Sequence, residues 1–191
     1  MPHNDDEVIN IMLDLETLGT RPGCKILSIG ATVFDTSSYR VLALTFYLRA
    51  DPNLQHKLHT YTAAEDWWAK QDPEVRAEAF GGSLMLLECL RGFVTWIENL
   101  KAEIGSNKIR IWCKGATFDV PIIEYAMEVY GVQVPWKYYE VACFRTLQDL
   151  GLSLGIDADK LDGDKHNALH DAINQAAHAE KILETLRAQV R

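Results

Sequence analysis

The sequence predicts an α/β protein in which a mixed β-sheet is flanked by helices. Three apolar runs of strand length, residues 9–17, 26–34 and 41–48, follow one another with only short connectors between them. Strands joined so closely pair antiparallel, and the first is central if both of its faces are apolar. Further along the chain, an amphipathic helix precedes another short apolar run, residues 109–113. A strand that follows a crossover helix favours parallel pairing.

The connectors and helices of the first half follow from glycine, proline and helical spacing. Residues 18–23 include Gly and Pro, which interrupt regular structure, and residues 35–40 form a turn-rich link. Pro73 is predicted to open a short helix, because its fixed φ suits the first turn. Apolar residues at helical spacing predict a helix over residues 83–101, with Ser83 as its N-cap.

The second half alternates helices with short strands. Thr117 is predicted to cap a helix that ends at Gly131. Residues 141–144 are predicted to form a last short strand and residues 146–154 a helix, followed by an acidic loop over residues 155–164. The C-terminal helix has one broad apolar side, formed by Leu169, Ala172, Ile173, Ala176, Ala177, Ile182 and Leu186.

Length and composition are those of a globular protein. With 191 residues, 48% of them hydrophobic and 24% charged, the chain is expected to form a single domain over residues 1–191. The sequence contains no apolar stretch of membrane-spanning length, and its cysteines are scattered, so we expect a cytoplasmic protein with free thiols and no membrane partner. The net charge of −8 argues against a broad basic surface for nucleic acid, but not against a metal-dependent nuclease.

Two carboxylates lie near the end of the first predicted strand. Side chains two residues apart share one face of a strand, so Asp14 and Glu16 project together past Leu15. Two carboxylates in a core are costly unless a cation neutralises them, which makes the pair a candidate metal site. The alternative is a strand end that reaches solvent, where both acids are hydrated.

Three further candidates lie at helix starts. Asp119 falls in the first turn of its predicted helix, where an acid is favourable whatever its function. His166 and Asp171 lie at the beginning of the C-terminal helix. Taken alone, His166 could be an exposed histidine at a helix entry.

The ordered set Asp14, Glu16, Asp119, His166 and Asp171 resembles the DEDDh group of 3'-5' exonucleases. This group is the DnaQ-like branch of the RNase H-like fold. The stretches LDLETLGT, GATFDVPII and HNALHDA match the first, second and third motifs of the group, and they occur in the right order. The resemblance implies an RNase H-like, mixed five-stranded sheet flanked by helices.

The resemblance also implies a reaction. The expected enzyme hydrolyses phosphodiester bonds at the 3' end of single-stranded or 3'-overhang nucleic acid and releases nucleoside 5'-monophosphates. Two Mg²⁺ ions, for which Mn²⁺ can substitute, stabilise the attacking and leaving oxygens in such a reaction. By resemblance, Asp14 bridges both metals, Glu16 and Asp171 complete the site for the nucleophilic water, and Asp119 supports the second metal. His166 is the expected general base.

Substrate contacts are predicted less directly. By resemblance, the backbone amides of Thr17, Leu18 and Gly19 contact the terminal nucleotide, and Leu18 wedges against its base. The alternative is an ordinary turn after the strand, which would also favour glycine at position 19. One indole of Trp67 and Trp68 is expected to stack on a base, with Trp68 as the candidate, although adjacent tryptophans more often pack against a helix.

Arg145 has two interpretations. It can hold a phosphate or pair with a carboxylate such as Asp149. Arg145 lies in the stretch CFRTL. This stretch and the WW pair are similar to the sequences of the subfamily that contains RNase AS and the T-even phage exonuclease A. That subfamily leaves RNA and DNA both open as substrates and allows a homodimer. A non-catalytic nucleic-acid or protein-binding module on a nuclease fold is the alternative function.

Overall fold

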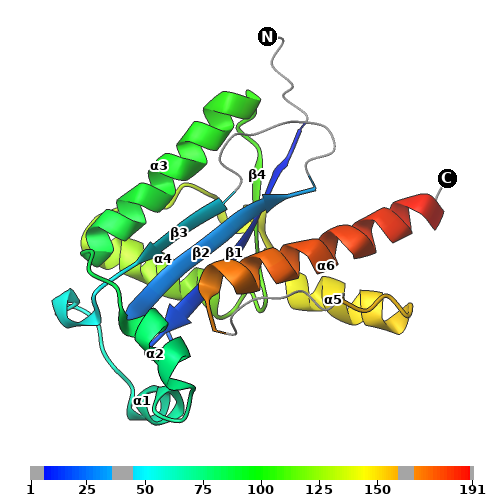
Figure 1. Cartoon of the computed structure of the whole chain (residues 1–191). Coiled ribbons are helices and arrows are strands. Elements are labelled where there is room, and N and C mark those ends of the chain that lie inside the picture. Colours follow the sequence, from blue (N-terminus) through cyan, green and yellow to red (C-terminus); the bar gives the residue numbers. More distant parts are fainter. Residues whose placement is uncertain (1–6, 36–44, 159–165, 190–191) are drawn as a thin grey trace.

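The computed structural model describes residues 7–35, 45–158 and 166–189, which form one mixed five-stranded sheet flanked by helices (Figure 1). The strands are β1 (Ile9–Thr17), β2 (Ile26–Phe34), β3 (Thr45–Arg49), β4 (Ile109–Cys113) and β5 (Val141–Cys143). They lie in the order β3-β2-β1-β4-β5. The predicted fold class is confirmed, and β1 lies at the centre of the sheet.

The pairing of β1 follows the expectation from sequence. It is antiparallel to β2 and parallel to β4, and β4 is parallel to β5. Every residue of β2 is buried and β1 is buried over most of its length, because helices cover both faces of the sheet. β3 begins at Thr45 among the described residues, so positions 41–44 of the predicted third strand lie outside them.

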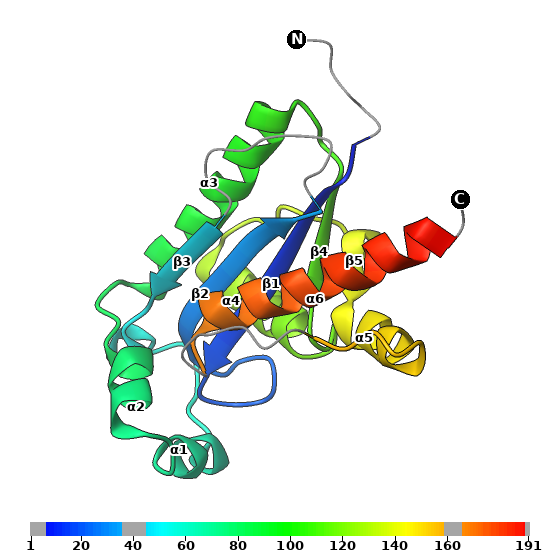
Figure 2. The same cartoon turned by 45° about the vertical axis from the view of Figure 1, so that its right-hand side comes forward.

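Helices cover the two faces of the sheet (Figure 2). On one face, α3 (Leu86–Ile104) and α4 (Asp119–Tyr130) pack against alternate β1 residues such as Ile11 and Leu13. On the other face, α5 (Phe144–Ser153) and α6 (Ala168–Gln189) enclose a smaller core around Met12 and Phe34. Among the described helices, none combines the length and apolar character that crossing a lipid bilayer requires.

The segment between β3 and α3 contains short helices near the carboxyl end of β1. These are the 3₁₀ turn η1 (Pro52–Leu54), α1 (Thr62–Trp68) and α2 (Pro73–Phe80). Pro73 opens α2 as predicted, and the Asp72 carboxylate accepts a hydrogen bond from the Glu74 amide at its start. A second 3₁₀ turn, η2 (Tyr138–Glu140), precedes β5.

Three predicted helix starts are wrong by one or two residues. α3 begins after Met85 rather than after Ser83, and the Met85 amide donates to the Glu88 carboxylate at 2.9 Å. α4 begins after Phe118 rather than Thr117, although it ends at Gly131 as predicted, in the left-handed conformation. α5 begins at Phe144 rather than Thr146, directly after β5.

The buried side of α6 differs from the purely apolar side that was predicted. Ala172, Ala176 and Ile182 are buried, but Ile173 is 37% exposed. Gln175 and His178 lie on the buried side instead. The helix is therefore oriented with a polar side chain, Gln175, toward the sheet.

Candidate active site

The carboxyl end of β1 places two acids on the side of the sheet that α6 covers. Asp14 pairs with Gly30 of β2 and Glu16 with Ser28, and a bulge between Glu16 and Thr17 then interrupts the regular pairing. Both carboxylates share one face, as the spacing predicted. Glu16 is buried rather than fully exposed at the strand end, since it is only 8% exposed.

Asp119 reaches the same place from the first turn of α4. Its side chain is buried, and its Oδ1 accepts a hydrogen bond from the Leu15 amide at 3.2 Å. Leu15 lies between the two β1 acids, so this bond ties the start of α4 to the end of the strand. Residues 104 positions apart in the chain are joined in this way.

The start of α6 brings the remaining acid into the cluster. The Asn167 carboxamide accepts hydrogen bonds from the amides of Leu169 and His170, and so caps the helix. The helix start lies directly on Gly30, where an added Cβ would come within 2.2 Å of the Ala168 carbonyl carbon. Only glycine leaves room for this approach, which brings Asp171 toward the sheet.

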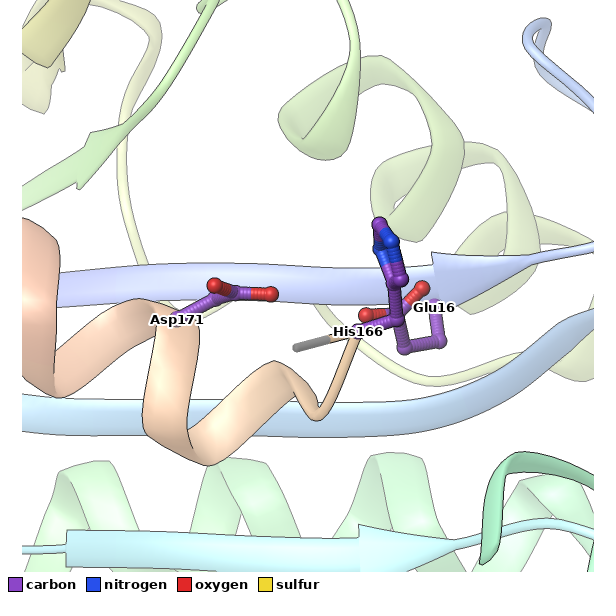
Figure 3. A group of neighbouring side chains, drawn as sticks. All are labelled: Glu16, His166 and Asp171. Atoms are coloured by element: carbon purple, nitrogen blue, oxygen red, sulfur yellow. The ribbon is translucent and has the colours of Figure 1, made fainter. Parts of the chain in front are cut away.

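Glu16, His166 and Asp171 form a compact group at this point (Figure 3). Their potential ligand atoms all lie within 4.8 Å of one another. Glu16 comes from β1, whereas His166 precedes α6 and Asp171 lies in its first turn. His166 has a left-handed backbone, with φ of 63°, an uncommon conformation for a residue with a side chain.

Gln175 is a site residue that the sequence did not reveal. Its Nε2 donates a hydrogen bond to Asp14 Oδ1 at 2.8 Å, and Gln175 is buried. Gln175 lies one helical turn after Asp171, which would have placed it on the same face of α6. A glutamine in a helix carries no such indication by itself, because the partner strand is known only from the fold.

The pKa of each of the four carboxyls is raised above its ordinary value. Burial, followed by the charges of Asp171 and Asp119, raises the pKa of Glu16 to about 8. Burial also raises the pKa of Asp119 to about 7, although backbone hydrogen bonds oppose the rise. Burial and the neighbouring acids raise the pKa of Asp14, and burial raises that of Asp171.

These observations fit a bound divalent cation. Four carboxylates converge in a partly buried place, where burial raises the pKa of each and the neighbouring acids add to the rise at Asp14 and Glu16. A bound cation would favour their ionised forms. Hard cations such as Mg²⁺ prefer oxygen ligands of this kind. The residues that could hold such a cation are Asp14, Glu16, Asp119 and Asp171.

A cleft of about 720 Å³ opens beside these acids. Trp67 lines it and is 42% exposed, and its ring lies edge-on to the His166 imidazole, with 4.8 Å between the ring centroids. Trp68 also borders the cleft but is only 2% exposed, and its indole N–H donates to the Thr17 carbonyl at 3.0 Å. This placement favours Trp67, not the expected Trp68, as the ring that a base can contact.

The loop after β1 corrects the expected role of Leu18. Its side chain is 3% exposed and packs with Leu27 and Trp68, so it cannot wedge against a base in this conformation. Its amide is also occupied, because it donates to the Lys25 carbonyl at 2.9 Å. Thr17 and Gly19, in contrast, do line the cleft, and the Thr17 hydroxyl donates to the Gly19 carbonyl at 2.6 Å.

Arg145 lies outside this cleft, in a smaller one of about 390 Å³ that also borders Asp14. The two clefts share Asp14, Leu15 and Phe118 as lining residues. Arg145 donates to the Lys114 carbonyl at 3.3 Å. Among the described residues, no ion pair joins it to Asp149, the carboxylate partner considered from sequence.

Solved structures share the fold. The nuclease domain of 3'hExo, a DEDDh family member bound to rAMP, aligns with a TM-score of 0.62 and 16% identity over 95% of this chain and 94% of that one. Cell-death related nuclease 4 (CRN-4) aligns with a TM-score of 0.63 and 13% identity over 93% and 64%. S. pombe Pop2p, in a form with Mg²⁺ and Mn²⁺ bound, aligns with a TM-score of 0.51 and 16% identity over 94% and 82%.

Sequence comparisons identify the family. An exodeoxyribonuclease of Enterobacteria phage T4 is 24% identical over an alignment of 127 residues that covers 61% of this chain and only 54% of the phage protein. The sequence model of the 3'-5' exoribonuclease Rv2179c-like domain matches residues 9–183, which include all five predicted DEDDh residues. The chain therefore belongs to the family of 3'-5' exoribonuclease Rv2179c-like domains.

Proposed function

We propose that the protein is a metal-dependent 3'-5' exonuclease that releases nucleoside 5'-monophosphates from the 3' ends of single-stranded or 3'-overhang nucleic acid. The observation that carries the proposal is the convergence of four carboxylates with raised pKa values beside His166, at the border of an open cleft. Family membership supports the same reaction.

In this proposal Asp14, Glu16, Asp119 and Asp171 hold two divalent cations, Mg²⁺ or Mn²⁺. When bound, such ions stabilise the attacking and leaving oxygens of a phosphodiester and neutralise the acids. Gln175 keeps the Asp14 carboxylate in one orientation through its hydrogen bond. The Leu15 amide does the same for Asp119.

His166 is the proposed general base. Its imidazole lies with Glu16 and Asp171 at the cleft, where it can take a proton from an attacking water. The Trp67 ring packs edge-on against the imidazole and leaves much of its own surface exposed to the cleft. We assign Trp67 to contact the terminal base, with Trp68 supporting it from the interior at a centroid distance of 4.9 Å.

RNA is the proposed first substrate. The family is described as exoribonucleases, whereas the phage relative is an exodeoxyribonuclease. The carboxylate site serves either backbone, because the chemistry takes place at the phosphate. The choice between the two depends on contacts to the 2'-hydroxyl of the sugar.

The test is a time course on matched single-stranded RNA and DNA oligonucleotides with a 5' label, in Mg²⁺, Mn²⁺ or EDTA. We expect stepwise shortening from the 3' end that requires metal and is fastest on RNA. Asp14→Asn should abolish turnover while the circular dichroism spectrum stays unchanged, and Glu184→Gln on the exposed side of α6 is the control. Turnover by Asp14→Asn at the wild-type rate would refute the proposal, and faster shortening of DNA would reverse the substrate assignment.

A further inference from the structure

We propose that Lys114 and Arg145 form a subsite for the phosphate that precedes the scissile one in the substrate strand. This inference rests on the proposed exonuclease function and adds the path of the strand. The terminal nucleotide occupies the larger cleft beside Trp67, and the rest of the strand leaves through the smaller cleft. Both clefts border Asp14, so the scissile phosphate lies at their junction.

The sheet topology places the two cations at the active-site edge. Lys114 directly follows β4, and Arg145 lies in the first turn of α5, directly after β5. Both strands run parallel to β1, so their carboxyl ends meet at the edge where β1 presents Asp14 and Glu16. The cations therefore lie beside the acids although they are distant in sequence.

The backbone between the cations leaves room for a ligand. Gly115 has a left-handed φ of 110°, and a Cβ added there would meet only Arg145 nitrogens, the nearest at 3.8 Å. The guanidinium is positioned by one hydrogen bond, from Nη2 to the Lys114 carbonyl at 3.3 Å. Its remaining donors can serve a phosphate, for which the planar fork of arginine is well suited.

Two cations and two acids line the smaller cleft. Among the described residues, neither Lys114 nor Arg145 forms an ion pair with a carboxylate. The Asp14 and Asp119 carboxylates line the same cleft, and the charge of Lys114 opposes the rise in the pKa of Asp171. Thr117 also lines this cleft. The net charge of −8 disfavours nucleic-acid binding as a whole, so two cations beside the acids would provide the local attraction that a strand requires.

The experiment separates this subsite from the reaction centre. We compare three proteins: the wild type, the double variant Lys114→Ala/Arg145→Ala, and the control Arg91→Ala on the exposed side of α3. Each is assayed on an oligonucleotide and on a p-nitrophenyl ester of a nucleoside 5'-monophosphate. Hydrolysis of the ester breaks the bond between phosphorus and the nitrophenyl oxygen, with water as nucleophile. The products are the 5'-monophosphate and nitrophenolate. The ester contains a single phosphate, so it has no preceding phosphate for the subsite to bind.

For the double variant we expect kcat/KM on the oligonucleotide to fall about tenfold or more, with the change mainly in KM. Hydrolysis of the ester should fall much less than that of the oligonucleotide, because the four carboxylates and His166 stay in place and only the effect of the Lys114 charge on Asp171 is lost. Equal losses on both substrates would place the cations at the scissile phosphate and overturn the inference. An unchanged oligonucleotide rate would also overturn it.

Binding gives an independent measurement. In an Asp14→Asn background, the slope of log affinity against log salt concentration for a labelled oligonucleotide should fall by about 0.7 for each lost phosphate contact. An unchanged slope would argue against the subsite. If the wild-type protein cleaves neither substrate, the proposed function fails, and this slope alone then decides whether the subsite exists.

Discussion

Gln175 donates a hydrogen bond from Nε2 to Oδ1 of Asp14, 2.8 Å away, and so connects the middle of α6 to the central strand. The two residues lie 161 positions apart. This bond holds the Asp14 carboxylate, one of the four proposed metal ligands, and the neutral amide donor adds no further negative charge.

Gln175→Leu should lower activity or metal affinity by about 10- to 100-fold, as is usual when the hydrogen-bond partner of a metal ligand is lost. The measurement is kcat against Mg²⁺ concentration. Gln189→Leu, at the exposed end of the same helix, is the matched control. Wild-type Mg²⁺ dependence in Gln175→Leu would show that Asp14 needs no such partner.

His166→Ala should reduce kcat by about 10²- to 10⁴-fold, the usual contribution of a general base. Metal binding should persist, because the four carboxylates remain. The two readouts are single-turnover cleavage and the increase in Tm on adding Mn²⁺. Loss of the Tm increase together with activity would assign His166 to metal binding instead.

Trp67→Ala should weaken oligonucleotide binding by about 1–3 kcal/mol, the value of a base stacked on an aromatic ring, whereas Trp67→Phe should retain most of the binding. Trp68→Phe provides the contrast. It removes the indole donor from the buried Thr17 carbonyl and should mainly lower stability, by about 1–3 kcal/mol. A larger binding loss in Trp68→Phe than in Trp67→Ala would reverse the assignment.

Gly30→Ala should destabilise the protein by about 1–3 kcal/mol or more, and it should lower activity, because α6 must move away from β2. Asp171 and Gln175 would move with the helix. Gly92→Ala in α3 is the control, since its nearest neighbour is the flexible end of Leu48 at 3.0 Å and alanine favours a helix. Denaturant unfolding and cleavage rates test both variants, and wild-type values for Gly30→Ala would contradict the close packing.

The metal-free protein should lose stability as the pH rises. Unfolded carboxyls titrate near pH 4, whereas burial raises the pKa of Asp119 to about 7 and that of Glu16 to about 8. The folded state therefore binds protons more tightly, so this stabilisation is fully present below about pH 4 and is lost as the pH passes 7 to 8.

Thermal unfolding in EDTA between pH 5.5 and 8.5 measures this loss. Mg²⁺ should restore Tm most strongly at the high end of the range, where the acids are ionised and metal binding displaces fewer protons. Asp14→Asn should flatten the pH dependence, because one of the repelling charges is absent. A Tm in EDTA that stays constant or rises over this range would contradict the electrostatic account.

Several features of the protein could be predicted from the sequence because they depend on local periodicity. The boundaries of β1 and β2 match the predicted strands, and the period of a strand placed Asp14 and Glu16 on one face. Three motifs that resemble those of the DEDDh exonucleases, and occur in the same order, predicted the family, with Asp119 and Asp171 in the first turns of helices. The strand pattern involves residues within one element, and the motifs can be read directly from the sequence.

The tertiary structure decided what depends on contacts between distant segments. The sequence could not show that Gly30 admits α6, or that Gln175 faces Asp14, because each depends on how a helix lies on a strand. Packing also buried Leu18 and Trp68 and left Trp67 exposed, although all three are apolar by composition. Burial is a property of the assembled core, and adjacent residues of one type are distinguished only when neighbouring elements cover one of them.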